Sequence, residues 1–141
     1  MNKFFITYNI RGWLTSINNA KLDNGGVLNE EEDAFGEKLS YNDILTAGNI
    51  TGTAQYNGNI SGMKWKTKGP SIAYISKNVN AYAFMYDKLN RLKLANYGSG
   101  ANGSTWDEQS GAYYEALTYD GMGNIQTLQR TISGGLIDIL A

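Results

Sequence analysis

The chain has 141 residues and a mass of 15.5 kDa, which fits a single domain. Its 12 Lys and Arg balance 13 Asp and Glu, so the composition gives no electrostatic footprint for nucleic acid or for an anionic membrane. Histidine and cysteine are both absent, which excludes disulfides, thiol nucleophiles, histidine-based catalytic triads and nearly all structural zinc sites.

The composition favours short strands and turns over helices, because the chain is rich in Gly and Tyr, with 17 and 10 residues. Residues 1–6 begin like a signal peptide, but the apolar run ends at Thr7, short of the roughly 7–15 apolar residues required. This start is therefore predicted to be a strand. No stretch approaches the ~18–20 apolar residues of a membrane span, so membrane insertion is not expected.

The first predicted element is a hairpin. Residues 4–8 form an apolar and aromatic run, residues 9–12 turn the chain, and residues 13–17 return. Residues 18–34 are mainly polar and are predicted to be an exposed loop. The acidic run within it, residues 29–33, lacks the alternating ligand spacing and central glycine of a calcium loop, so no metal site is predicted.

The middle of the chain contains further strand signals. Residues 35–41 alternate loosely and predict a strand, whereas residues 43–47 are consistent with one helical turn. Residues 56–58 form a turn signal, and Ile60, Met63 and Trp65 are assigned to the strand that follows. Alternating lysines on this segment are typical of a solvent-facing side or a protected edge strand rather than a nucleic-acid patch: Lys64, Lys66 and Lys68.

The clearest hairpin runs in over residues 81–86, turns at 87–90 and runs out over 91–97. Successive strand residues point to opposite faces, so the three large aromatics of the first strand share one face. The predicted pairing sets them against two leucines of the second strand as one buried face: Tyr82, Phe84, Tyr86, Leu92 and Leu94. Residues 98–111 are predicted to be a loop, and residues 136–140 form an apolar segment with nothing downstream to pair with.

One turn pattern recurs: Tyr, then Asp or Asn, two variable residues, Gly or Asn, a polar or aromatic residue, then Leu or Ile. Residues 8–14, 86–92 and 119–125 follow it, and a degenerate copy at 58–63 has Ala54 in the tyrosine position. Tyr86 and Tyr119 are 33 residues apart. This regularity predicts an all-β chain of antiparallel hairpin repeats that form a curved sheet or partial solenoid. The signature residues are Tyr8, Gly12, Leu14, Gly58, Asn59, Ile60, Tyr86, Asp87, Arg91, Leu92, Tyr119, Asp120, Gly123, Asn124 and Ile125.

These motifs resemble the YD-repeat family, also called RHS repeats, over essentially the whole chain. The segments 86–92 and 119–125 match its motif closely, residues 8–14 match with Asn in place of Asp, and the intervening stretches resemble RHS-like surface proteins of Bacteroidetes. In the family, such repeats form a long ribbon of hairpins that spirals into a hollow shell, typically around a C-terminal toxin or effector. Related modules occur in insecticidal toxin complexes and in teneurins. The resemblance implies enclosure, delivery or surface interaction rather than turnover.

The chain departs from the family pattern in two ways. It contains no recognisable core segment with a self-cleaving aspartyl protease and no recognisable effector, so neither activity is carried over. Family members usually run to many hundreds of residues, so this chain is interpreted as a fragment of a larger protein. That protein is expected to be secreted or at the cell surface, whereas a stand-alone truncated product would be cytoplasmic.

Several side chains have both a binding and a structural interpretation. The motif tyrosines are interpreted as packing residues whose hydroxyls bond nearby backbone. Asp87 and Asp120 are interpreted as turn residues. Carbohydrate contact is a weaker hypothesis for the three tryptophans: Trp13, Trp65 and Trp106. The adjacent Asp107 and Glu108 do not predict a glycosidase, because neighbouring strand residues point to opposite faces.

The leading functional hypothesis is a non-catalytic structural segment of an RHS-type shell, with no cofactor. Its expected partners are further repeats or a second copy, through open strand edges, and an enclosed effector polypeptide. The alternative hypothesis is a carbohydrate-binding or adhesive module that uses exposed Trp and Tyr, with glycans as partners. Binding of nucleic acid is not expected.

Overall fold

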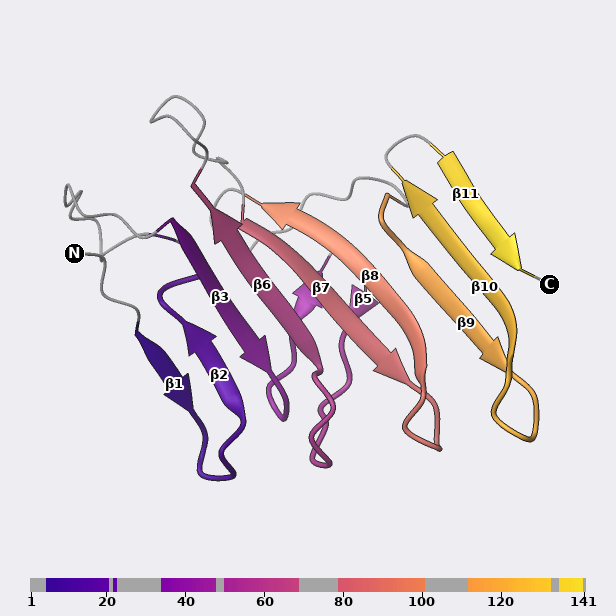
Figure 1. Cartoon of the computed structure of the whole chain (residues 1–141), viewed down its shortest axis with the longest axis horizontal. Helices are drawn as coiled ribbons and strands as arrows, with labels where there is room; N and C mark the ends of the chain where they lie inside the picture. The colour runs from indigo at the N-terminus through magenta and orange to yellow at the C-terminus, as the bar shows by residue number, and fades with distance from the viewer. Residues whose placement is uncertain are drawn as a thin grey trace.

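The computed structural model describes residues 5–20, 22, 34–47, 50–68, 79–100, 112–132 and 135–140. It is all-β, and every strand pair is antiparallel. The main sheet has nine strands in the order β1-β2-β3-β6-β7-β8-β9-β10-β11 (Figure 1). These are β1 (Ile6–Tyr8), β2 (Leu14–Ile17), β3 (Phe35–Ser40), β6 (Gly62–Thr67), β7 (Val79–Tyr86), β8 (Leu92–Gly100), β9 (Glu115–Tyr119), β10 (Ile125–Ile132) and β11 (Gly135–Leu140). A separate pair consists of β4 (Thr46–Ala47) and β5 (Ile50–Thr51).

Sequence neighbours pair throughout the main sheet. The predicted hairpins are confirmed as β1–β2, β7–β8 and β9–β10. β3 pairs with β6 although residues 41–61, which include β4 and β5, separate them in sequence. We call residues 41–61 the excursion. Each pair then joins the next, through β2–β3, β6–β7 and β8–β9. As a result, the turns that follow β1, β7 and β9 lie on the same side of the molecule, at one end of the strands (Figure 1).

The most deeply buried strand residues are small ones on β7, which corrects the predicted core. Val79 is 1% exposed and Ala81 and Ala83 are fully buried, whereas the aromatics on the opposite face of β7 remain partly exposed. Leu45, from the segment before β4, packs against the two alanines. The cause is steric: a covering segment can approach a sheet closely only where the side chains beneath it are small.

The same covering segment explains a glycine at the start of β6. A Cβ placed on Gly62 would lie 2.7 Å from the Cβ of Leu45 and 3.0 Å from the carbonyl oxygen of Tyr82. Figure 1 shows β5 behind the main sheet in this region. The excursion therefore forms a lid on one face of the central strands.

The register of β7 and β8 also differs from the prediction. Tyr82 lies opposite Tyr97, Phe84 opposite Ala95 and Tyr86 opposite Leu92. Leu94 instead lies opposite Met85, because the register shifts between Met85 and Tyr86. Such a bulge changes which residues share a face, and alternation alone cannot reveal it.

Three other predicted elements are corrected. Residues 46–47 form strand β4 rather than part of a helical turn. β8 continues to Gly100 instead of ending in a loop at residue 98, because Gly98 and Gly100 pair with Ala81 and Val79. The predicted loop 18–34 is not exposed throughout, since Ala20 is 5% exposed and the Asn19 carbonyl packs over Gly36.

The apolar segment near the end of the chain also has a partner. Residues 135–140 form β11, which pairs with β10 upstream. The acidic run 29–33, the pair at 107–108 and Trp106 lie outside the described residues. Within the residues that are described, no helix is long and apolar enough to cross a membrane.

Candidate functional site

Three turns each contain the same pattern of hydrogen bonds around an Asn or Asp side chain. The Oδ1 atom of Asn9 accepts from the amides of Arg11 and Trp13 at 2.9 and 3.0 Å. The same atom of Asp87 accepts from residues 89 and 91, and that of Asp120 from residues 122 and 124, at 2.8 to 3.0 Å. These are the structural hydrogen bonds predicted for the two aspartates, and the Asn at position 9 makes them equally well.

Main-chain bonds close the same three turns. The amide of Asn9 donates to the carbonyl of Trp13, and the amide of Gly12 donates to the carbonyl of Asn9, both at 2.9 Å. Equivalent bonds occur in the turns at Asp87 and Asp120. In each turn, the fourth residue counted from the Asn or Asp has a positive φ: 76° at Gly12, 62° at Asn90 and 95° at Gly123. Gly and Asn occupy this position because other side chains clash with the backbone there.

The two aspartate turns carry charge that their hydrogen bonds stabilise. The pKa of Asp120 is lowered, first by its side-chain bond with Asn124 and then by the Asn124 amide. The pKa of Asp87 is lowered first by the Arg91 amide, and the Arg91 guanidinium adds an ion pair at 2.7 Å. Both carboxyls are therefore engaged in holding their own turns.

A second set of contacts crosses the boundaries between hairpins. The hydroxyl of Tyr86 donates to the carbonyl of Ile60, and the hydroxyl of Tyr119 donates to the carbonyl of Leu92, each at 2.7 Å. The hydroxyl of Tyr41 donates to the carbonyl of Leu14 at 2.8 Å. In each case, a tyrosine at or just after the end of one hairpin's first strand reaches a residue at or just before the start of the preceding hairpin's second strand.

Tyr41 corrects the degenerate copy of the turn pattern. Ala54 was predicted to occupy the tyrosine position, but the residue that makes the bond to the preceding hairpin is Tyr41. It follows β3 directly, and the part of the excursion that carries β4 and β5 separates it from Gly58, whose φ is 103°. The signal was available, since Tyr8 and Tyr41 are 33 residues apart, the same spacing as Tyr86 and Tyr119.

The residue five positions after the motif tyrosine also reaches the next hairpin. Trp13 packs on Tyr41 with ring centroids 5.1 Å apart. Arg91 lies 4.4 Å over the Tyr119 ring and donates to the carbonyl of Asp120 at 3.3 Å. Asn59, at the equivalent place in the degenerate copy, donates to the carbonyl of Asn90 at 3.2 Å. Each described hairpin is therefore connected to the next by a tyrosine hydroxyl bond and by the contacts of one further side chain.

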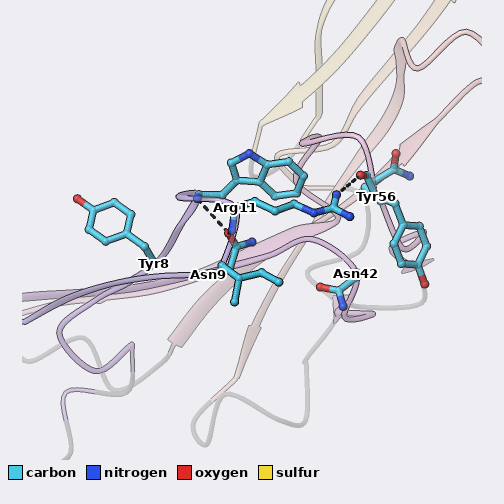
Figure 2. Close-up of a pocket in the computed structure, with 8 residues that line it drawn as sticks. Tyr8, Asn9, Arg11, Asn42 and Tyr56 are labelled. Carbon is cyan, nitrogen blue, oxygen red and sulfur yellow. Dashed lines mark hydrogen bonds between the residues drawn. The ribbon is translucent and has the colours of Figure 1, made fainter.

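Tyr8 differs from the other motif tyrosines. It is 62% exposed, and its hydroxyl makes no hydrogen bond among the described residues. The residue borders a pocket of about 480 Å³ together with its neighbours Asn9, Ile10, Arg11 and Trp13. The opposite wall comes from the excursion, through Asn42, Gln55 and Tyr56 (Figure 2). We call this site the Arg11 pocket.

The guanidinium of Arg11 is fixed inside this pocket. Its Nη1 atom donates to the carbonyl of Tyr56 at 2.6 Å, and the group lies 5.1 Å over the ring of Trp13 (Figure 2). A Cβ on Gly58 would approach the Trp13 ring to 3.3 Å. Arg11, Gly58 and Tyr41 thus surround the Trp13 ring, which reduces the ring area available to a ligand.

The other candidate tryptophan has a packing environment. Trp65 is partly buried and stacks on Tyr82 with centroids 5.8 Å apart, and Tyr82 stacks in turn on Phe84 at 5.9 Å. Tyr97 completes the cluster against Tyr82 at 5.5 Å. Trp106, the third candidate, lies outside the described residues. Trp13 was predicted as a candidate contact from the sequence, whereas three other residues that line the pocket were not predicted: Tyr8, Arg11 and Tyr56.

The described fold defines an antiparallel all-β chain whose hairpins are tied by tyrosine hydroxyls. Comparison of the chain with protein-family models, with curated proteins and with solved structures found no match. Among the described residues, no group of three or more acidic side chains could hold a metal ion.

Proposed function

We propose that the chain is a non-catalytic structural segment of an RHS-type β-shell, within a larger surface or secreted protein. Its role there would be enclosure or delivery of an effector polypeptide, or surface interaction. The observation that carries the proposal is the bond from a strand-end tyrosine hydroxyl to the preceding hairpin, made by Tyr41, Tyr86 and Tyr119. A bond that joins successive hairpins in the same way suits an array that extends by addition of similar units.

Several of the described carboxylates are used within the fold. The carboxyls of Asp87 and Asp120 hold their turns, and Glu115 pairs with Arg130 at 2.8 Å. With histidine and cysteine absent from the sequence, these arrangements favour a structural role over catalysis.

The proposal is tested through the open edges of the sheet. β1 and β11 end the strand order, and an unpaired edge is a template for another strand. We expect light scattering over a concentration series to show self-association. Ile6→Lys, which puts a charge on edge strand β1, should weaken it. Ile10→Lys is the matched control, because Ile10 is fully exposed in a turn away from the strand. A monomer at every concentration would contradict the proposal.

A second candidate function is glycan binding at the Arg11 pocket. The pocket combines exposed tyrosines with amide groups, and this composition suits the apolar faces and hydroxyls of a sugar. The test is a panel of glycans titrated against intrinsic tryptophan fluorescence, with Trp13→Phe to identify the reporting ring. Binding would be seen as a saturable change that the Trp13→Phe protein lacks, whereas a panel without any response would remove this candidate.

A further inference from the structure

We propose that the Arg11 pocket binds a carboxylate-bearing sugar residue, a hexuronate, with the Arg11 guanidinium as its anion-binding group. This inference rests on the second candidate function, glycan binding, and adds the chemical class of the sugar. Three properties of the pocket carry it: its unneutralised charge, its rigidity and its aromatic walls.

Among the described residues, the charge of Arg11 has no carboxylate partner. In the part of the chain that the structure describes, its contacts are the Tyr56 carbonyl and the Trp13 ring, and no carboxylate lies within ion-pair distance. The other two arginines of the chain behave differently, since Arg91 pairs with Asp87 and Arg130 with Glu115. A guanidinium has five N–H donors, so Arg11 keeps most of them for a ligand. A carboxylate is the planar acceptor that matches this fork.

The guanidinium is also held in place before any ligand arrives. The 2.6 Å bond to Tyr56 fixes one end, and the Trp13 ring supports the group from one side. A flexible surface arginine loses side-chain freedom when it binds an anion, whereas this one has already lost much of it on folding. Preorganisation of this kind favours binding at the pocket over binding at other exposed cations of the chain.

The walls of the pocket indicate a sugar rather than a small acid. Tyr56 is 68% exposed and lies beside the Arg11 guanidinium, whereas the Tyr8 ring, 62% exposed, points away from Arg11 (Figure 2). The exposed Tyr56 ring, next to the cation, can contact the apolar C–H face of a pyranose. The amide of Asn42, which is exposed near Arg11, can bond sugar hydroxyls (Figure 2). A neutral sugar would leave the cation unused, and a simple carboxylate would leave the ring unused.

The test is calorimetric titration of the full chain with trigalacturonate, with its fully methyl-esterified form and with sodium acetate. We expect saturable binding of trigalacturonate, at least about tenfold weaker binding of the ester, and no measurable binding of acetate, because charge-assisted hydrogen bonds supply much of the affinity. Arg11→Gln should lower the trigalacturonate affinity about tenfold or more. Asn42→Asp should do the same, since it adds a carboxylate to the pocket at an exposed position where folding is not at risk.

Lys93→Gln is the matched control: it removes one positive charge from an exposed position on β8, away from the pocket, and should leave the affinity unchanged. Equal affinity for the acid and the ester would overturn the hexuronate inference while leaving glycan binding in place. Binding of acetate as tight as that of trigalacturonate would overturn the sugar assignment. No binding of either glycan would remove both the inference and the second candidate function.

Discussion

The hydroxyl of Tyr119 donates a 2.7 Å hydrogen bond to the carbonyl of Leu92, across the boundary between the hairpins β7–β8 and β9–β10. The same bond joins Tyr86 to Ile60 and Tyr41 to Leu14. Removal of the hydroxyl leaves the ring packing in place, so Tyr→Phe substitutions measure the contribution of this bond alone.

We expect each of Tyr41→Phe, Tyr86→Phe and Tyr119→Phe to lower the free energy of unfolding by about 0.5–1.5 kcal/mol, the usual contribution of a neutral hydrogen bond. Urea denaturation measures the change. The control is Tyr56→Phe, because the Tyr56 side chain is exposed and its hydroxyl makes no bond among the described residues. If the three variants were as stable as this control, the cross-boundary bonds would contribute nothing to stability.

Gly62→Ala should lower the free energy of unfolding by about 1–3 kcal/mol, the usual cost of overpacking. The new methyl group would lie 2.7 Å from the Cβ of Leu45, which cannot move away without displacing its own backbone. Gly121→Ala is the matched control, since an added Cβ there meets nothing within 4 Å. The comparison is made by thermal and urea unfolding. Equal stability of the two variants would mean that Leu45 does not cover β6 and β7 closely.

Asn90 tests the requirement for a left-handed residue in the β7–β8 turn. Its φ is 62°, whereas the equivalent positions in two other turns hold Gly12 and Gly123. We expect Asn90→Gly to change stability by less than about 1 kcal/mol and Asn90→Ala to destabilise by about 1–2 kcal/mol, because Ala lacks both the freedom of Gly and the polar side chain that lets Asn adopt this conformation. Urea midpoints compare the two. The prediction fails if Ala is tolerated as well as Gly.

The aspartate turns should make stability depend on pH. Because the folded pKa of Asp87 and of Asp120 lies below the ordinary value of 3.8, the folded state favours the charged form. Their contribution is complete above the ordinary value and is lost as pH falls through the lower folded pKa. Urea midpoints between about pH 6 and about pH 2.5 should therefore fall with acidification.

A double variant, Asp87→Asn with Asp120→Asn, provides the control for this pH dependence. Asn9 already makes both equivalent backbone bonds with a neutral amide, so the turns should still form. The variant should show a shallower fall in midpoint at acid pH than the natural chain. An unchanged slope would assign the acid sensitivity to other carboxyls.

The sequence by itself determined the local structure. The high Gly and Tyr content, the alternating apolar residues and the Asp, Asn and Gly turn chemistry were sufficient to predict an all-β chain, its main hairpins and the hydrogen bonds of Asp87 and Asp120. These features depend on contacts between residues a few positions apart, which the sequence contains directly.

Only the tertiary structure decided which residues far apart in the sequence contact each other. It placed Leu45 over Ala81 and Ala83, assigned Tyr41 rather than Ala54 to the second hairpin, and set Leu94 opposite Met85 through a bulge. It also brought Arg11 to Tyr56, 45 residues away in the chain, to form the pocket. Each of these depends on how an excursion folds back or how a register shifts, and alternation of side chains carries no information on either.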